Sequence, residues 1–227
     1  MKPDISEELV LQAAGHTRVA GIDEAGRGAW AGPVYAAAVV LPLDRDDLLD
    51  LLASVRDSKQ LSRTRREELL PAIREVAEAV GVGWAEPAEV DEIGIAPATR
   101  QAMARAVAGL DGRVNALLID YVRLPELDLP QRSLAKADIH CLSVAAASIV
   151  AKVTRDRLMI ALDEGFPGYG FARHKGYGTR QHREALARLG PSPIHRMSWR
   201  PMQELVLREN IDDKTLPQPG KQSQYMV

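Results

Sequence analysis

The chain has 227 residues, 46% hydrophobic and 26% charged, which is typical of a globular protein with a sizeable core, and its formal net charge of −2 does not by itself suggest a polyanionic partner. A single cysteine, Cys141, excludes an intramolecular disulfide, and no uninterrupted apolar run approaches the ~20 residues that span a bilayer. The acidic start of the chain (Asp4, Glu7 and Glu8) argues against a secretory signal, so we expect a cytoplasmic protein without membrane contact.

Apolar patterning predicts an α/β protein. Residues 18–23 and 34–41 are apolar runs separated by a glycine-rich turn, which predicts an antiparallel pair of strands. Further strands are expected at 80–85, 114–119 and 133–136, and helices at 62–79 (capped by Ser62), 98–110, 143–162, 179–189 and about 201–209. Strands that alternate with helices in this way predict a mixed sheet covered by helices.

Four acidic residues stand at the ends of short apolar or partly apolar runs, namely Asp23, Glu24, Asp120 and Asp138. One such acid is usually a solvated loop residue, but Asp23 and Asp120 each end a predicted buried strand. In a parallel pair these strand ends lie side by side, where two carboxylates repel each other by about 1 to 4 kcal/mol. A divalent cation offsets that repulsion, and oxygen ligands without a cysteine–histidine cluster favour magnesium or manganese over zinc.

Adjacent side chains of a strand point to opposite faces of the sheet. For Asp23 and Glu24 to share a site, we therefore expect the first strand to end at Asp23, with residues 25–26 turning Glu24 back toward it.

Residues 18–42, in which Gly26-Arg27-Gly28 follows the acid pair, resemble the first signature of ribonuclease HII. Further segments resemble the same family and occur in the same order: Asp57–Ser62, Leu118–Asp120, Lys136–Asp138, Ala145–Arg157, His174–Thr179 and Gly190–Arg196. The resemblance covers about residues 18–205. Ala137 departs from the glycine that is frequent in the family at that position, while the acid after it is kept.

This resemblance implies a ribonuclease H-like fold, a mixed five-stranded sheet flanked by helices with a small C-terminal helical appendage. The expected organisation is an N-terminal extension (1–17), a catalytic core (18–163), a substrate-binding appendage (164–210) and a flexible tail (211–227). The implied enzyme hydrolyses the RNA strand of RNA–DNA hybrids and nicks duplex DNA 5′ of embedded ribonucleotides. Two metal ions, Mn²⁺ or Mg²⁺, would assist the hydrolysis, which gives a 5′-phosphate and a 3′-hydroxyl. We expect a monomer.

The resemblance also assigns roles to residues. Asp23, Glu24, Asp120 and Asp138 would be the catalytic, metal-binding acids, and Gly26, Arg27 and Gly28 would present backbone groups to the ribonucleotide 2′-hydroxyl. Tyr177 would stack near the following deoxyribose, although a half-buried aromatic of this kind is often only structural. The candidate phosphate contacts are Lys59, Lys152, Lys175, Arg180 and Arg196.

The charge is unevenly distributed. Between Lys152 and Arg200 there are ten basic and four acidic residues, a net charge of +6, so the rest of the chain carries −8. Any one of these basic residues suits a solvated helix face, but together, with glycines and a tyrosine among them, they suit a surface that follows phosphates.

Other interpretations are weaker. The glycines at 26, 28 and 32 approximate a dinucleotide fingerprint, but the segment after them continues into a strand and not into the helix that this motif needs. His174, His182 and His195 fit no compact metal motif, so hydrogen-bonding roles are expected for them. Asp156 is expected to form an ion pair on a helix surface. The alternative functions are another metal-dependent nuclease of this fold and a non-catalytic nucleic-acid-binding module.

Overall fold

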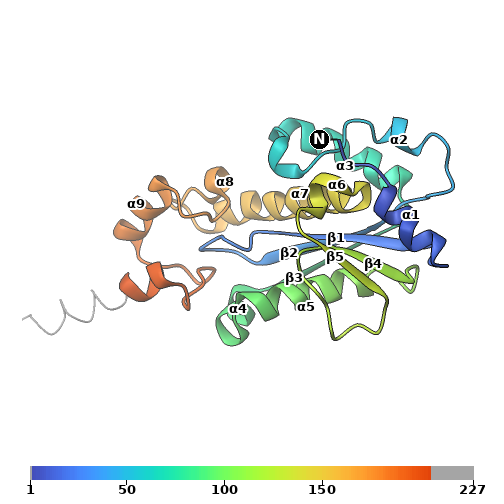
Figure 1. Ribbon diagram of the computed structural model, residues 1–227. Coiled ribbons are helices and arrows are strands. Elements are labelled where there is room, and N and C mark those ends of the chain that lie inside the picture. Colours follow the sequence, from blue (N-terminus) through green and yellow to red (C-terminus); the bar gives the residue numbers. More distant parts are fainter. Residues whose placement is uncertain (1, 206–227) are drawn as a thin grey trace, which may run out of the picture.

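Residues 2–205 are described by the structure, a computed structural model (Figure 1). Five strands form one mixed sheet in the order β3-β2-β1-β4-β5. Their bounds are β1 Val19–Ala25, β2 Val34–Val40, β3 Ala79–Ala85, β4 Ala116–Asp120 and β5 Gln131–Leu134. The central strand β1 pairs antiparallel with β2 and parallel with β4, so the first hairpin and a crossover connection meet at β1.

Helices cover both faces of the sheet. They are α1 Ser6–Ala13, α2 Leu48–Leu51, the 3₁₀ turn η1 Ser58–Gln60, α3 Arg63–Val76, α4 Pro87–Ile93, α5 Ile95–Ala108, α6 Ala137–His140, α7 Leu142–Gly165, α8 Phe171–His174 and α9 Arg180–Leu189. In the view of Figure 1, α3, α6 and α7 lie above the sheet and α4 and α5 below it, while α8 and α9 lie beyond one end.

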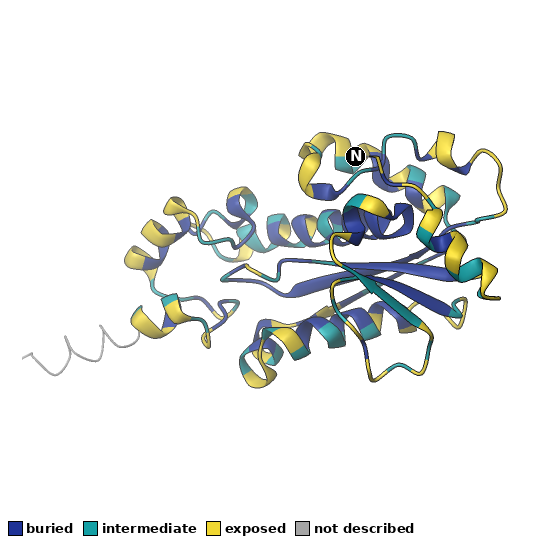
Figure 2. Ribbon diagram, in the orientation of Figure 1, coloured by how far each residue is buried: buried dark blue, intermediate teal, exposed yellow. Residues whose placement is uncertain are grey.

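The long helix α7 packs directly on β1 because small residues face each other at the contact. A Cβ atom built on Gly21 would lie 2.3 Å from the carbonyl carbon of Ser143 and 2.4 Å from the backbone nitrogen of Val144. The first half of α7 is rich in buried alanine, which permits the same close approach along its length. As Figure 2 shows, β1, β2 and the inner side of α7 are almost entirely buried.

The C-terminal appendage has an apolar cluster of its own around Phe171, with Tyr169, Leu186 and Met202. Ala31, from the β1–β2 connection, and Met159, from α7, belong to the same cluster, so the core and the appendage share it. Helix α7 also runs past residue 163, the expected boundary, to Gly165. Helix α7 and the shared apolar cluster therefore join the appendage directly to the core.

The structure confirms the expected fold class, the strand pair at the start of the core and the long helix that follows Cys141. It corrects one strand end, because β1 continues to Ala25 and does not stop at Asp23. The reason is the neighbouring strand β2, whose ladder still pairs Glu24 with Ala36 after β4 has ended. Residues 200–205 are helical as expected; the rest of that expected helix and the tail at 211–227 lie outside the described residues.

Helices α1 and α4 were not predicted from the pattern. Helix α1 lies in the expected N-terminal extension, and its Glu8 carboxylate accepts hydrogen bonds from the backbone N–H and the hydroxyl of Ser143, at 2.9 and 2.6 Å. Helix α4 begins with Pro87 and a capping box between Glu86 and Glu89. No helix within residues 2–205 combines the length and the apolar character needed to cross a membrane.

The Gly21 contact predicts that Gly21→Ala destabilises the fold by about 1 to 3 kcal/mol, because the methyl group would force the β1 and α7 backbones apart. Urea denaturation measures this as a lower midpoint with an unchanged slope. Gly165→Ala is the matched control, since a Cβ there meets no atom within 4 Å. Equal midpoints for the two variants would contradict the packing described here.

Candidate active site

The candidate site forms where the parallel strands β1 and β4 end. Their register pairs Ile22 with Ile119, so the next residue of each strand, Asp23 and Asp120, stands at the same edge of the sheet. The Asp23 carboxylate is buried and accepts a hydrogen bond from the Glu24 N–H at 2.8 Å. The Asp120 carboxylate accepts one from the Ala137 N–H at 2.9 Å, which ties α6 to the end of β4.

A cavity of about 210 Å³ opens beside these strand ends. It is lined by residues from five segments: Asp23, Glu24, Ala25, Gly26, Arg27, Gly28, Ser58, Lys59, Asp120, Lys152 and Tyr177. Nine of these are sequence-predicted site residues, and they come from positions spread over most of the described chain. Although β1 continues past Asp23, both Asp23 and Glu24 line the cavity, which lies just beyond the last β1–β4 pair, Ile22 and Ile119.

The acids of this cavity are held close together at low solvent exposure. Burial raises the pKa of Asp23 well above its usual range, and repulsion from Glu24, Asp120 and Asp138 adds to the rise. Burial also raises the pKa of Glu24, which the Arg27 guanidinium 3.8 Å away partly opposes, and that of Asp120. Such a cluster is stabilised in its ionised form by a bound cation.

The donor set fits a hard divalent cation. Asp23, Glu24 and Asp120 offer carboxylate oxygens only, which are the ligands that magnesium and manganese prefer. Within residues 2–205, no three Asp, Glu, His or Cys side chains are already close enough together to enclose an ion as they stand. The three carboxylates therefore supply oxygen ligands of the kind that such a cation takes.

Asp138, the fourth predicted acid, lies at the start of α6 and does not line the cavity. It is buried, and its carboxylate accepts a hydrogen bond from Lys59 Nζ at 3.1 Å. Burial opposes a charge on Lys59, but this bond and the nearby acids Asp57 and Asp23 raise the pKa of its ammonium group above the usual range. Lys59 thus neutralises part of the acid cluster from the solvent side, with 77% of its side chain exposed.

The Gly-Arg-Gly loop is held from beneath by a buried arginine. Arg196 Nη2 donates to the Gly26 carbonyl at 2.8 Å and Nη1 donates to the Arg27 carbonyl at 2.9 Å, while Nε bonds the Gly32 carbonyl at 3.0 Å. Because these carbonyls point inward, the opposite edge of the loop faces the cavity. Among the described residues, the N–H groups of Arg27 and Gly28 have no hydrogen-bond acceptor.

A second buried arginine, Arg155, joins the two segments that border the cavity. Its guanidinium donates to the carbonyls of Pro33, Ala31 and Lys175, at 2.9, 3.1 and 3.0 Å. Gly26 is required here: its φ is +87°, and a Cβ would lie 1.9 Å from Arg155 Nε. Arg155 therefore fixes the loop against the chain that leads to Tyr177.

Tyr177 is half-buried at the cavity wall. Lys152 Nζ lies 5.3 Å from the centre of its ring and the Arg155 guanidinium carbon lies 5.4 Å from it. Both distances are in the cation–π range. The ring is thus supported by two cations, which hold the aromatic side chain beside the acids.

Three of the five predicted phosphate contacts do not reach this cavity. Arg196 is fully buried, and its guanidinium bonds only backbone carbonyls, which corrects the expected direct contact, since the residue instead shapes the loop. Lys175 is also buried, and its ammonium group bonds the Ala172 carbonyl. Arg180 is exposed on α9, where it pairs with Glu184 at 2.7 Å beside a different hollow.

Two contributors were missed. Ser58 lines the cavity, and its N–H is held by the buried Ser148 hydroxyl at 3.1 Å; it directly precedes Lys59 in the Asp57–Ser62 segment, which was the available signal. Arg155 was expected only as one of the basic residues between 152 and 200. The sequence around it does not indicate that its side chain points inward. Asp156 does form the expected ion pair, with Lys152 at 2.8 Å, but it is buried and not on the surface.

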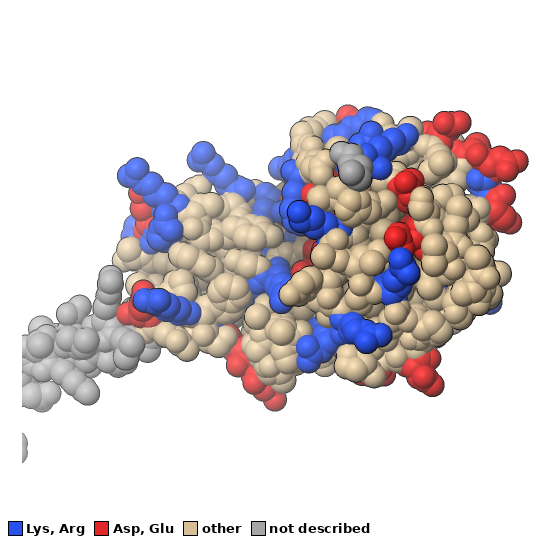
Figure 3. Space-filling model, viewed as in Figure 1, with Lys and Arg blue, Asp and Glu red and all other residues tan. Residues whose placement is uncertain are grey.

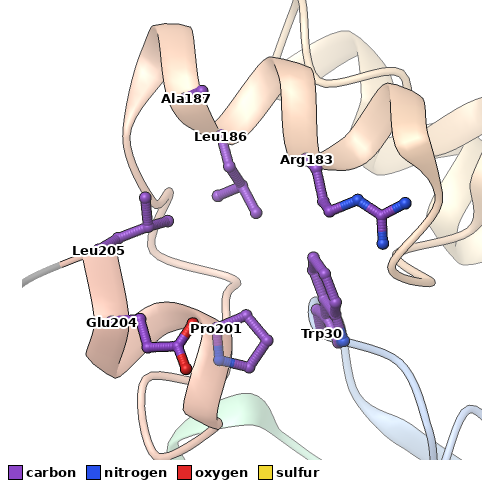
Figure 4. A pocket seen from close by; sticks show the side chains of 7 residues that line it. All are labelled: Trp30, Arg183, Leu186, Ala187, Pro201, Glu204 and Leu205. Carbon is purple, nitrogen blue, oxygen red and sulfur yellow. The ribbon is translucent and has the colours of Figure 1, made fainter.

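A larger hollow of about 320 Å³ lies in the appendage (Figure 4). Trp30 forms one wall, Leu186 and Ala187 of α9 a second, and Pro201 and Leu205 a third. Among the described residues that line it, Glu204 is the one acid, so it lacks the group of carboxylates that gathers at the smaller cavity. The 210 Å³ cavity at the sheet edge is therefore the candidate active site.

Basic side chains lie near the junction of core and appendage. Figure 3 shows Lys and Arg side chains along the upper side of the appendage and of the adjoining part of the core. Of the ten basic residues between 152 and 200, Arg155, Lys175 and Arg196 point inward. The others remain available to solvent or to ion pairs, so the basic surface is smaller than the sequence suggests.

Comparisons with known proteins agree with this fold. A model of the ribonuclease HII family matches residues 20–202. The ribonuclease HII of Chloroflexus aurantiacus is 55% identical over 207 residues, which cover 91% of this chain and 98% of that protein. Among solved structures, ribonuclease H2 from Pyrococcus horikoshii has a TM-score of 0.71 at 26% identity, covering 85% of this chain and 99% of that one.

A further solved structure is the RNase HII of Archaeoglobus fulgidus in its complex with PCNA. It has a TM-score of 0.68 at 32% identity and covers 82% of this chain and 96% of that one. The mixed sheet and its relatives thus define the protein as a ribonuclease H, a hydrolase with an α/β fold. Within that class, the chain belongs to the ribonuclease HII family, the endoribonucleases that act on RNA–DNA hybrids.

The role of Arg196 predicts that Arg196→Lys lowers the free energy of unfolding by about 2 to 4 kcal/mol. A single ammonium group cannot reach the Gly26, Arg27 and Gly32 carbonyls together, and each buried carbonyl left unpaired costs about 1 to 3 kcal/mol. Arg183→Lys is the control, because Arg183 is exposed and bonds one carbonyl at 3.3 Å. Chemical denaturation of both variants checks the difference, and equal stability would argue against a supporting role for Arg196.

Proposed function

We propose that this ribonuclease H nicks duplex DNA on the 5′ side of an embedded ribonucleotide and also hydrolyses the RNA strand of hybrids. The observation that carries the proposal is the shared cavity: Asp23, Glu24 and Asp120 face it together with the Gly26–Gly28 loop and Tyr177. Acids alone would suit any metal-dependent nuclease of this fold. The neighbouring loop and aromatic ring add a surface that can distinguish a ribose from a deoxyribose.

In this proposal Asp23, Glu24 and Asp120 hold Mg²⁺ or Mn²⁺ directly, and Asp138 is the fourth acid of the site. When bound, two such ions would activate the attacking water and stabilise the leaving 3′ oxygen, which gives a 5′-phosphate and a 3′-hydroxyl. The protein's own contribution is to hold the carboxylates at one sheet edge. Lys59, hydrogen-bonded to Asp138, limits their mutual repulsion.

The 2′-hydroxyl would be recognised by the backbone of the Gly26–Gly28 loop. The N–H groups of Arg27 and Gly28 would donate to its oxygen, and Gly28 lies beside the cavity. Tyr177 would stack against the next sugar, while Lys59 and Lys152 are the basic residues of the cavity that would contact phosphates. Contacts to sugar and backbone carry no base preference, so cleavage should depend little on sequence.

The proposed partners are RNA–DNA hybrids and duplex DNA that contains a ribonucleotide. The monomeric state and the cytoplasmic location expected from the sequence belong to the same proposal. Arg180, which is exposed on α9, would contact only those parts of a duplex that extend over the appendage.

Asp120→Asn should reduce cleavage of a duplex that contains one ribonucleotide by at least about 100-fold, equivalent to roughly 2.7 kcal/mol in activation free energy. Binding and folding should be nearly unchanged, because the amide oxygen can still accept the bond from Ala137. Wild-type cleavage should vanish with a chelator and return with magnesium or manganese.

The control is Asp128→Asn, which changes an acid in the loop before β5, outside the residues that line the cavity. Cleavage is followed on a labelled duplex and binding by anisotropy. Undiminished cleavage by Asp120→Asn would remove Asp120 from the site, and metal-independent cleavage would remove the proposed chemistry.

Gly28→Ala tests ribonucleotide recognition separately. A Cβ at Gly28 meets no protein atom within 4 Å, so the variant should fold like the wild type while its methyl group obstructs the sugar. Loss of one such polar contact costs about 1 to 3 kcal/mol, so cleavage should fall roughly 5- to 150-fold. Gly165→Ala, also unobstructed, should cleave normally.

The substrates for that test are duplexes with one ribonucleotide and the same duplex made only of DNA. The wild type should cut the first almost regardless of the base and spare the second. Equal cutting of both would leave a generic nuclease of this fold, and binding without cutting under any metal condition would favour a non-catalytic module.

A further inference from the structure

Three histidines, His174, His182 and His195, form a buried group in the appendage. His174 and His182 stack with ring centres 4.4 Å apart, and the Nε2 atoms of His182 and His195 lie 2.9 Å from each other. Around them pack Phe171, Trp30 and Tyr169. No part of the cavity chemistry described above uses these rings, yet His174 and His182 bond the backbone on either side of Tyr177.

The hydrogen bond at His195 determines the tautomer of that ring. His195 Nδ1 lies 2.8 Å from both the backbone N–H and the hydroxyl of Ser192, and 3.2 Å from the Ser192 carbonyl. The N–H can only donate and lies closer than the carbonyl, so it opposes a proton on Nδ1. Nδ1 therefore carries a lone pair, so the proton of the neutral ring is on Nε2. That Nε2–H points at His182 Nε2, which must accept it.

The tautomer of His182 follows from the same reasoning. Since its Nε2 accepts, its proton is on Nδ1, and Nδ1–H donates to the backbone carbonyl of Tyr177 at 3.1 Å. The Thr179 N–H donates to the same carbonyl at 2.8 Å, so both of its lone pairs are engaged. A chain of donors thus runs from the Ser192 N–H through two imidazoles to Tyr177.

His174 secures the residue before the tyrosine. Its Nδ1 accepts the Gly176 N–H at 3.2 Å, so its proton is on Nε2, which donates to the Tyr169 carbonyl at 2.9 Å. Its own carbonyl accepts the Tyr177 N–H at 3.0 Å. The backbone of residues 176–177 is therefore held by imidazole nitrogens on both sides.

We propose that His182 and His195 are positioning residues: a relay of fixed tautomers that places Tyr177 at the active-site cavity. The inference rests on the proposed function only in assuming that Tyr177 contacts the substrate. The histidines themselves do not line the cavity.

The relay works only with neutral rings. A second proton on His195 would face the Ser192 N–H, and one on His182 would face the His195 N–H. The charged groups nearest the cluster are Asp163 on α7 and Lys175 after α8, both of which act on His174. Burial in this apolar surrounding lowers the pKa of His182 and of His195 to about 4, so both remain neutral at neutral pH.

The first test measures tautomers in the wild-type protein and needs no activity. With ¹⁵N-labelled histidine, long-range ¹H–¹⁵N NMR at neutral pH should show the Nδ1–H form for His182 and the Nε2–H form for His174 and His195. The signals of His182 and His195 should not titrate between mildly alkaline and mildly acidic pH, well above their pKa values of about 4. An Nε2–H form of His182, or titration of His182 in that range, would overturn the relay.

The second test uses two amide substitutions that differ only in where they place the donor. In His182→Asn the side-chain N–H would lie near the former Nδ1 position and keep the bond to the Tyr177 carbonyl, whereas in His182→Gln the longer side chain would reach toward His195 and lose that bond. In the relay, His182→Gln should lower kcat on the one-ribonucleotide duplex about 10- to 100-fold, as expected for a misplaced contact group, and His182→Asn should stay within about threefold of wild type.

The same pair of variants in a Tyr177→Ala background separates positioning from mere stability. If His182 acts through Tyr177, His182→Gln should add no further loss of kcat there. Equal losses for the Asn and Gln variants, or a full additional loss without Tyr177, would overturn the proposal. If the wild-type protein cleaves the all-DNA duplex as fast as the duplex with one ribonucleotide, the proposed function is wrong. That result would leave the tautomer assignments unchanged.

Discussion

The structure depends on two buried guanidinium groups that bind backbone carbonyls. Arg155 from α7 and Arg196 from the appendage both lie under the β1–β2 connection, and every hydrogen bond described for their guanidinium groups is to a carbonyl oxygen. A carbonyl carries only a partial charge, so neither arginine is neutralised by it. Burial lowers the pKa of Arg196 to about 9, and repulsion from Arg155 contributes, yet Arg196 stays charged at neutral pH.

This arrangement explains how core and appendage act as one unit. The apolar cluster around Phe171 already includes Ala31 and Met159 from the core. The arginines add directional bonds across the same junction, and removal of either would leave several buried carbonyls without partners. The conformation of the Gly26–Gly28 loop is thus fixed by Arg155 and Arg196, which lie on its buried side. Its outer surface can remain open to a ligand.

Positive and negative charges are segregated within a short distance at the site. The carboxylates of Asp23, Glu24 and Asp120 gather at the sheet edge, where burial and mutual repulsion oppose their ionised forms. The cations Lys152 and Arg155 lie against the Tyr177 ring. Under the proposed function, a divalent cation would balance the carboxylates and Lys152, which lines the cavity, would meet a phosphate, whereas the buried Arg155 only supports the ring.

The sequence by itself determined the fold class, the strands that carry Asp23 and Asp120, and the identity of most residues around the cavity. These follow from local features: apolar runs of strand length, acids directly at their ends, and a glycine loop that leads into a strand. The parallel pairing that brings Asp23 beside Asp120 was also predictable, because the carboxyl ends of such strands meet at one edge.

Only the tertiary structure decided the direction in which the basic side chains point. Arg196 and Arg180 look alike in the sequence, but one is enclosed by the β1–β2 connection and the other lies on an exposed helix face. The end of β1 was likewise set by its neighbour, since β2 pairs with Glu24 after β4 has stopped. The histidine tautomers have the same origin: each is fixed by a donor or acceptor that lies far away in the chain or across a turn, and no local pattern records it.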